Sequence, residues 1–348
     1  MPNFWFAIPG DAKTLTGGYI YAQRLIKSLP SAGWHPHLLP LPGGFPNPTK
    51  EELKHTQRTF EKLPEGAVVL VDGLAFGSLP QDMLNGLDLR FAVLVHHPLA
   101  LESGLSKFEE SRLHASEKAA LKMACVVLTT GPSTARTLIT RFGVDTQKLF
   151  VAPPGTHSAG RAQRRRDVPQ LLTVAPLTYR KGHDVLVHAL AAIADLQWES
   201  VWTGSMTREP KTTSMVRDMI KSYDLEDRID LRGEVDSQAL QNIYLQSNAF
   251  VLPSRHEGYG MAFAEAMAYG LPVIGCAVGA VPETVPGDAS LLVKPDDPKA
   301  LAIALRQLLK STDGGSALAD AAWFHGQQLP RWSDTAKAVA KALSVVIQ

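Results

Sequence analysis

Residues 253–272 read PSRHEGYGMAFAEAMAYGLP, and this stretch indicates the class of fold. Apolar runs at 249–253 and 272–276 flank it, as expected for two buried parallel strands joined by a helix. Gly258 and Gly260 let the chain turn tightly off the first strand, and the strong helix formers that follow predict a helix beginning near Gly260. The stretch is therefore a strand-helix-strand unit of an α/β protein.

Short apolar runs alternate with helical patterns along the whole chain, in two series. The first series predicts strands at residues 4–8, 37–41, 67–71, 90–96, 125–129 and 150–153. The second predicts strands at residues 171–175, 199–203, 229–233, 249–253, 272–276 and 290–293. Since one hydrophobic core stops growing at about 250 to 300 residues, a chain of 348 residues is expected to form two domains, each with its own parallel sheet.

The charge balance and the cysteine count limit the classes of partner. Lys plus Arg number 35 against 34 Asp plus Glu, so no global positive field is available to bind nucleic acid. The two cysteines have no metal-ligand spacing, and no apolar run reaches the ~18 residues that span a bilayer. Pro9, Gly10 and Asp11 interrupt the place of a signal-peptide core. We expect a cytoplasmic protein.

The predicted helix start at Gly260 is suited to bind phosphate. The first amides of a helix lack acceptors within it, and the helix N-terminus carries about half a positive charge. In an open parallel sheet this start lies at the carboxyl ends of the strands, where ligands bind. Glu257 and Glu265 lie on either side of it and would accept hydrogen bonds from sugar and ribose hydroxyls. The alternative is that both glutamates are solvated surface residues.

Glu257, seven intervening residues and Glu265, in the surroundings EGYG and EAMAYGLPV, resemble the signature of the retaining glycosyltransferases of family four, or glycosyl transferases group 1. The resemblance covers most of the chain. It implies the GT-B architecture, an α/β class with two facing Rossmann-like domains, parallel sheets and an interdomain cleft. It also implies that this loop and helix bind the nucleotide-sugar donor through Gly258, Tyr259, Gly260, Met261, Ala262 and Glu265.

The domain limits combine composition with this resemblance. Residues 155–169 are rich in Gly, Ser, Ala, Gln and Arg and predict a linker. The segment 331–348 predicts an amphipathic helix, which the resemblance returns to the first domain. We therefore expect an acceptor-side domain at 1–160 plus 331–348 and a nucleotide-sugar-binding domain at 161–330.

Arg180 and Lys181 follow the predicted strand 171–175 and precede a helical run. A forked guanidinium beside an ammonium can neutralise a diphosphate, although a bare Arg-Lys pair is more often a solvated face. The pair resembles the family's basic element, with one departure. The family commonly has an arginine where this chain has Pro176, so the arginine function moves to Arg180 or is absent.

Two further glycine turns resemble loops of the family that meet the donor. Gly17 and Gly18 precede a predicted helix, and the resemblance places them against the donor phosphate when the cleft closes. Gly233 and Val235 come after residues 229–231 of the predicted strand and resemble the loop that frames the base. A glycine pair alone is more often a simple turn.

His96 and His97 end an apolar strand directly before a proline. A histidine at such a place is often a hydrogen-bonded structural residue, and the lack of a third ligand argues against zinc. The resemblance favours His96 as a contact to the transferred sugar, with His97 as the alternative if the alignment slips by one. The catalytic assignments are His96, Glu257, Arg180 and Lys181.

The reaction implied is transfer of a hexosyl group from a nucleotide diphosphate sugar, a UDP-sugar in preference to a GDP-sugar, with the anomeric configuration kept. The cations and the helix amides substitute for a metal, since no Asp-x-Asp arrangement for Mg²⁺ is present, so we expect no cofactor. We favour front-face attack over double displacement.

The sequence does not distinguish between a glycan, a lipid and a small molecule as the acceptor. Arg164, Arg165 and Arg166 read as a solvated linker or as a contact to anionic lipid heads at the inner membrane face, so peripheral membrane contact stays open. Phe4, Trp5, Phe6 and Trp34 read as core or as a surface for an amphiphilic acceptor.

The alternatives are a nicotinamide-dependent oxidoreductase and a protein that binds a sugar nucleotide without transferring the sugar. A nicotinamide-dependent oxidoreductase requires a GxGxxG turn with an acidic residue about 20 positions later, and neither half has one. No feature of this sequence distinguishes an enzyme from a protein that binds a sugar nucleotide without transferring the sugar.

Overall fold

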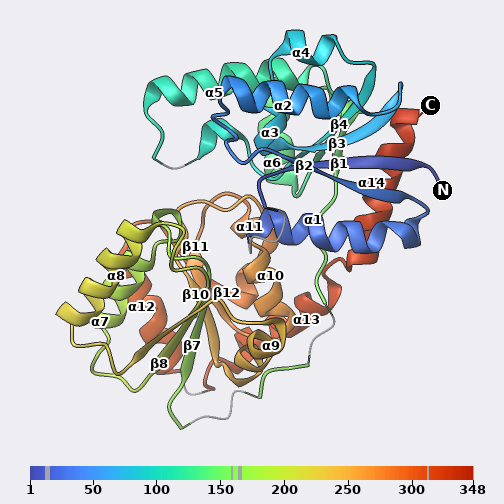
Figure 1. Ribbon diagram of the computed structural model, residues 1–348. Helices are drawn as coiled ribbons and strands as arrows, with labels where there is room; N and C mark the ends of the chain where they lie inside the picture. The colour runs from blue at the N-terminus through green and yellow to red at the C-terminus, as the bar shows by residue number, and fades with distance from the viewer. Residues whose placement is uncertain (12–15, 103, 158–159, 164–166, 312, 348) are drawn as a thin grey trace. The chain divides into compact units, whose positions relative to one another are not determined.

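The computed structural model describes residues 1–11, 16–102, 104–157, 160–163, 167–311 and 313–347 (Figure 1). The chain divides into two compact units, Met1–Gly155 with Pro330–Gln348, and Thr156–Leu329. The sequence placed the first boundary after residue 160, slightly later than the structure does. Residues 158–159 and 164–166 of the predicted linker, including the run Arg164, Arg165 and Arg166, lie outside the described residues.

The first unit is built on a six-stranded parallel sheet in the order β2-β1-β3-β4-β5-β6. Its strands are β1 Asn3–Pro9, β2 His35–Leu41, β3 Ala67–Asp72, β4 Leu89–Val95, β5 Val126–Thr129 and β6 Leu149–Val151. Its longer helices are α1 Gly17–Ser28, α2 Lys50–Glu61, α5 Lys107–Leu121 and α14 Trp332–Ile347. Shorter helical turns are η1 Leu29–Ala32, α3 Gly73–Phe76, α4 Gln81–Asn85, η2 Leu99–Leu101, α6 Pro132–Thr137, η3 Leu138–Phe142 and η4 Thr146–Lys148. All six strands predicted for this half are confirmed.

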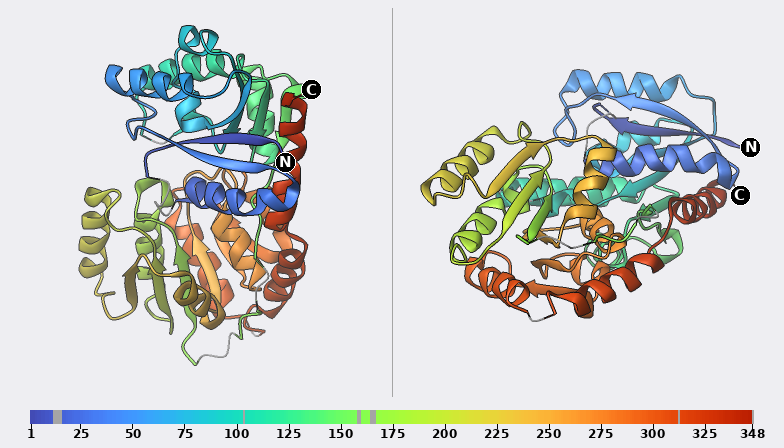
Figure 2. Two further views of the ribbon diagram at one scale, coloured as in Figure 1. Left: turned by 45° about the vertical axis from the view of Figure 1, so that its right-hand side comes forward. Right: turned by 90° about the horizontal axis from the view of Figure 1, so that it is seen from below.

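Both faces of this sheet are covered, which is why every residue of β3 is buried. The carboxy-terminal helix α14 packs against β3, β4, β5 and β6 and against α1, as Figure 2 also shows. Phe4, Phe6 and Trp34 are buried, so the core reading is confirmed for these three, whereas Trp5 is partly buried and packs against the core.

The second unit repeats the architecture with the strand order β12-β11-β10-β7-β8-β9, all neighbours parallel. Its strands are β7 Gln170–Val174, β8 Glu199–Thr203, β9 Ile229–Gly233, β10 Ala249–Leu252, β11 Val273–Cys276 and β12 Ser290–Val293. Its helices and helical turns are η5 Tyr179–Lys181, α7 His183–Ala191, α8 Pro210–Ser222, α9 Ser237–Gln246, α10 Met261–Ala268, α11 Val281–Thr284, η6 Gly287–Ala289, α12 Pro298–Leu309 and α13 Ser316–Gln328. The six strands predicted for this half are confirmed.

Successive strand residues enter different cores, as the pleat requires. Leu171 and Val251 join the core that includes residues of α7, α8 and α12. Leu172 and Phe250 join the opposite core, which includes residues of α9, α10 and α13. The strand order reverses between β10 and β7, so the loops after these two strands start side by side. In open parallel sheets ligands bind at such a reversal, beyond the carboxyl ends of the strands.

None of the helices within the described ranges is long and apolar enough to cross a bilayer.

Candidate functional site

The loops that follow β7 and β10 touch each other directly. Gly182 ends the turn η5 with a φ of +70°, and a Cβ added there would lie 2.1 Å from the carbonyl oxygen of Pro253. The amide of Arg255 donates to the carbonyl of Arg180 at 2.8 Å. The turn that carries Arg180 and Lys181 is therefore fixed by backbone contacts to the loop that carries Glu257.

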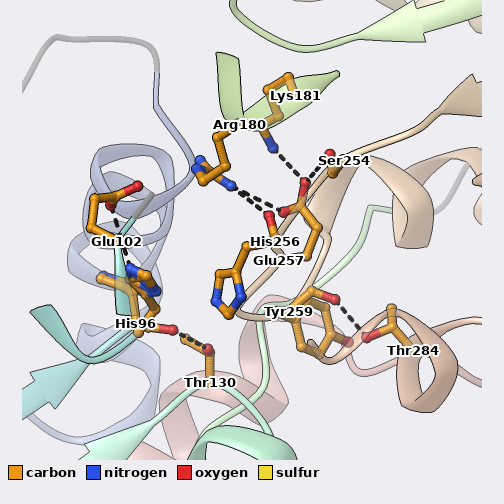
Figure 3. A network of polar contacts seen from close by, with 11 residues as sticks. His96, Glu102, Thr130, Arg180, Lys181, Ser254, His256, Glu257, Tyr259 and Thr284 are labelled. Atoms are coloured by element: carbon orange, nitrogen blue, oxygen red, sulfur yellow. Dashed lines mark hydrogen bonds and ion pairs between the residues drawn. The ribbon is translucent and has the colours of Figure 1, made fainter. Parts of the chain in front are cut away.

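Lys181, Arg180 and Ser254 surround the carboxylate of Glu257, which is 6% exposed (Figure 3). The Nζ of Lys181 and the Oγ of Ser254 both donate to Oε1 of Glu257, each at 2.6 Å. Arg180 has its Nη1 3.8 Å from Oε2 and donates to the carbonyl of His256 at 2.8 Å. The two basic residues and the first glutamate of the motif thus form one cluster.

Glu257 is held as an anion in this cluster. Burial alone raises the pKa of a carboxyl group, but the charges of Lys181 and Arg180 and the hydrogen bonds from Lys181 and Ser254 hold the pKa of Glu257 below its usual value. The expectation from the sequence was that the cations bind a diphosphate and that Glu257 binds sugar hydroxyls. In the structure these groups neutralise one another.

The helix predicted near Gly260 is confirmed as α10, which begins at Met261. Gly260 has a φ of +87°, and a Cβ there would lie 2.9 Å from the ring of Phe263. Its carbonyl accepts from the amides of Phe263 and Ala264, so the amides of Met261 and Ala262 precede the first bonds of the helix. Backbone N–H groups at this end are suited to an anion.

The loop before α10 is packed against α11 and against Ala280, the residue before that helix. Thr284 Oγ1 donates to the carbonyl of Tyr259 at 2.6 Å, and the amide of Ala280 donates to the carbonyl of Glu257 at 3.0 Å. Burial raises the pKa of the Tyr259 phenol to about 12. Gly258 lies between these two anchored residues. This packing positions the backbone of the loop.

Glu265 lies on α10 with an intermediate exposure. Its Oε2 accepts from the phenol of Tyr244 at 3.3 Å, and Tyr244 stacks on Tyr269 with ring centroids 4.7 Å apart. The hydrogen bond from Tyr244 therefore holds the carboxylate of Glu265 about one helix turn beyond the loop. Tyr244 was not identified from the sequence.

Gly233 is the last residue of β9, and Val235 follows it at the same end of the sheet. Gly233 has a φ of +68° and accepts from the amide of Gly204 at 2.8 Å. The side chain of Val235 packs partly buried against the core of this unit. The structure thus gives the Val235 side chain a packing contact.

In the first unit, His96 follows β4, and its side chain is 26% exposed. A Cβ added at Gly18 would lie 3.3 Å from Cδ2 of His96, so the start of α1 at Gly17 can approach the ring because residue 18 is a glycine. Thr130 Oγ1 donates to the His96 carbonyl at 3.4 Å. The structure brings His96 and Gly18 together.

Asp72 is a neighbour of His96 that sequence reasoning missed. Its Oδ2 lies 3.6 Å from Nε2 of His96, and its Oδ1 accepts from the amide of Leu74 at 2.8 Å. Burial raises the pKa of Asp72 and lowers that of His96, and their mutual attraction opposes both shifts. His97 instead has its Nε2 3.4 Å from Glu102. Asp72 directly follows a predicted strand, which is the signal that could have identified it.

Further polar residues beside the second-unit cluster were also missed. Burial, together with the charges of Arg180 and Arg208, acts to lower the pKa of Lys181 against the attraction of Glu257, so Arg208 is a third cation whose charge acts on Lys181. Arg255 forms a bidentate ion pair with Asp184. Within the described ranges, no group of three or more His, Cys, Asp or Glu is arranged to hold a metal ion.

Comparisons with known proteins find similarity to glycosyltransferases. Residues 168–311 match the model of the family described as glycosyl transferases group 1. The D-inositol 3-phosphate glycosyltransferase of Kineococcus radiotolerans is 30% identical over 247 residues, which cover 61% of this chain and 55% of that protein. The mannosylfructose-phosphate synthase of Agrobacterium fabrum is 28% identical over 204 residues, covering 53% of this chain and 45% of that protein. The chain thus spans about half the length of these curated relatives.

Solved structures resemble the chain over nearly its full length. A sucrose-phosphate synthase from Thermosynechococcus elongatus has a TM-score of 0.83 at 23% identity, covering 99% of this chain and 98% of that one. The Anabaena protein HepE in complex with UDP has a TM-score of 0.76 at 16% identity, covering 99% and 100%. The GT-B fold and the family identified from the sequence are confirmed: the chain has the GT-B fold, and its residues 168–311 belong to the glycosyl transferases group 1.

Proposed function

We propose that this protein is a retaining glycosyltransferase that moves a hexosyl group from a nucleotide diphosphate sugar to an acceptor hydroxyl. The observation that carries the proposal is the convergence of Arg180 and Lys181 on Glu257, three residues before the helix start at Gly260. A diphosphate requires two negative charges to be neutralised, and two cations beside a helix N-terminus supply that.

Donor binding exchanges partners within this cluster. Lys181 and Arg180 now neutralise Glu257. A diphosphate bound at the Met261 and Ala262 amides draws both cations toward its oxygens, because it carries more charge than one carboxylate. Glu257 then accepts hydrogen bonds from the hydroxyls of the sugar, and Glu265 accepts from those of the ribose.

Transfer proceeds by front-face attack in this proposal. The bond between the anomeric carbon and the diphosphate oxygen breaks while the acceptor oxygen approaches the same face, and the leaving phosphate takes the proton of the acceptor hydroxyl. Negative charge grows on the leaving group, so Arg180, Lys181 and the helix amides bind the transition state more tightly than the ground state. We propose that these groups act without a divalent metal.

The first unit contributes His96, which we propose contacts the transferred sugar, with Gly17 and Gly18 near the donor phosphate. Asp72 faces Nε2 of His96 at 3.6 Å and favours a proton on that nitrogen. The Nδ1 of the ring is then the acceptor for a sugar or acceptor hydroxyl.

We propose a UDP-sugar as the donor, supported by the likeness of the fold to a protein crystallised with UDP. The acceptor is a glycan, a lipid or a small molecule, and the names of two relatives contain a phosphorylated small molecule. We propose a cytoplasmic protein, with the inner face of the membrane as the place of action if the acceptor is a lipid.

The test is release of free nucleotide from a panel of UDP- and GDP-sugars. Each donor is incubated alone, with D-inositol 3-phosphate and other sugar phosphates, and with cell lipid extract. Acceptor-dependent release of nucleotide is expected, and NMR of the product is expected to show the donor's anomeric configuration. An inverted product contradicts retention. Binding of nucleotide without release on any acceptor shows a binding protein and overturns transfer.

Glu265→Ala is expected to weaken donor binding by about 1.5–3 kcal/mol, because a carboxylate that hydrogen-bonds the ribose is removed from the exposed side of α10. The measurement is the dissociation constant of UDP by titration calorimetry. Tyr244→Phe serves as a control, since it removes only the phenol that supports Glu265. An unchanged dissociation constant in Glu265→Ala contradicts the ribose role.

Arg180→Ala is expected to lower kcat more than it raises the KM of the donor. The stabilisation by its guanidinium grows as charge builds on the leaving diphosphate, so its loss falls mainly on the transition state. Steady-state kinetics with varied donor concentration separate the two constants. If KM rises as much as kcat falls, Arg180 binds donor and transition state equally.

A further inference from the structure

Arg255 is nearly saturated with contacts to the protein. Its Nε donates to Asp296 at 2.7 Å, and its two terminal nitrogens donate to the two oxygens of Asp184 at 2.9 and 2.7 Å. Nη1 also donates to the carbonyl of Tyr179. The guanidinium carbon lies 3.9 Å from the centroid of the Tyr179 ring. Four of the five N–H groups of an arginine are therefore engaged with the protein.

These contacts hold both ends of the turn that carries Arg180 and Lys181. Tyr179 begins the turn and Asp184 lies just beyond it, and Arg255 binds both. The backbone amide of Arg255 also donates to the carbonyl of Arg180 at 2.8 Å. Since Arg255 stands two residues before Glu257, one side chain links the cations to the loop of their carboxylate partner.

The charge of Arg255 is already balanced by its neighbours. Asp184 and Asp296 place two carboxylates on one guanidinium, and the side chain of Arg255 is 11% exposed. Although burial disfavours the charged form, the bonds to Asp184 and Asp296 raise the pKa of Arg255, so it stays protonated. Arg255 therefore affects a bound anion mainly by fixing the positions of neighbouring groups and only weakly through its own charge.

We propose that Arg255 is a positioning residue that sets the orientation of Arg180 and Lys181 toward the donor diphosphate. The inference rests on the proposed function for the identity of the ligand. It deepens that function by assigning the residue that shapes the cation pair. The planar fork matters, because a lysine keeps the charge but loses the bidentate pair, the stacking on Tyr179 and the bond to its carbonyl.

The test compares Arg255→Lys with Arg306→Lys. Arg306 is a matched control in the same unit, because it also forms a bidentate pair, with both oxygens of Asp195 at 2.6 Å, but joins α12 to the loop after α7. UDP is the binding probe. Arg255→Lys is expected to weaken UDP binding about tenfold and to lower turnover about 100-fold, as expected for misplaced binding groups. Arg306→Lys is expected to leave both near wild type.

A double-mutant cycle separates positioning from general damage. Arg180→Ala is expected to cost less UDP affinity in the Arg255→Lys background than in the wild type. In that background the Arg180 side chain is already displaced, so it contributes less to UDP binding. Additive losses overturn the proposal. Asp184→Asn provides a second variant with an unchanged side-chain shape, and it is expected to reproduce the coupling if Arg255→Lys folds poorly.

A measurement without nucleotide distinguishes the failure of this inference from that of the proposed function. The Lys181 side chain is 12% exposed beside Glu257, so its acetylation by an amine-reactive reagent is expected to be slow. Mass spectrometry is expected to show several-fold faster acetylation of Lys181 in Arg255→Lys and no change in Arg306→Lys. An unchanged rate overturns the positioning role. Faster acetylation in a protein that binds no nucleotide keeps the positioning role and overturns the proposed function.

Discussion

Replacing Lys181 with Met is expected to remove measurable turnover and to destabilise the second unit by about 3–5 kcal/mol. Met has nearly the length of Lys but no charge, so Glu257 keeps only its hydrogen bond from Ser254 and the more distant Arg180. A carboxylate that is 6% exposed is then left largely unpaired. Urea unfolding followed by circular dichroism measures the loss, and nucleotide release measures the turnover.

The two effects of Lys181→Met can be separated with a second change. Lys181→Met combined with Glu257→Gln removes both charges, so most of the lost stability is expected to return while turnover stays absent. Lys221→Met, at an exposed lysine of α8, is the control and is expected to change neither quantity. Wild-type turnover in Lys181→Met contradicts the role of the cation pair.

The pH dependence of stability follows from the same pair. The pKa of Glu257 is lowered in the folded protein, so its ion pair contributes stability that is fully present above the ordinary carboxyl pKa. This contribution is lost as the pH falls through the lowered value. In Lys181→Met the main cause of the lowered pKa of Glu257 is removed, so the loss of stability on acidification is expected to be smaller than in the wild type, as measured by urea unfolding at a series of pH values.

Gly182→Ala is expected to have the second-largest effect, because the backbone conformation and the available space both oppose a side chain. A non-glycine residue at a φ of +70° costs about 1–2 kcal/mol, and the added Cβ would overlap the Pro253 carbonyl at 2.1 Å. Relief of that overlap moves the cation turn away from the loop of Glu257. We therefore expect both lower stability and weaker UDP binding.

Gly314→Ala is the matched control for this prediction. Gly314 is in the same unit with a φ of +59°, but a Cβ there meets nothing within 4 Å. It is expected to lose only the stability that the backbone conformation costs and to bind UDP normally. Equal losses of stability and equal UDP binding in the two variants contradict the close contact between the loops after β7 and β10.

The strands and the start of α10 were predictable because they depend on local patterns. Buried parallel strands are short apolar runs, and the two glycines before Met261 mark a turn from strand to helix. The cations and both glutamates were predictable as site residues because each lies in the segment between a strand and the next helix or near the start of α10. These features require no knowledge of which strands are neighbours.

The pairing within the cluster was not predictable from the sequence. Lys181 and Glu257 are 76 residues apart, and they meet only because β7 and β10 are adjacent where the strand order reverses. Arg255 meets Asp184 across 71 residues for the same reason. A polar residue after a strand is visible in the sequence, but its partner depends on the order of strands in the sheet.

The position of α14 has a consequence for how the chain folds during synthesis. Val339 and Leu343 of this helix are fully buried in the first unit, yet they are translated after the whole of the second. Since translation adds about 5–20 residues per second, one surface of the amino-terminal sheet stays exposed for on the order of ten to thirty seconds before α14 is synthesised. Nascent chains paused on the ribosome before residue 330 should therefore recruit chaperones at that uncovered surface.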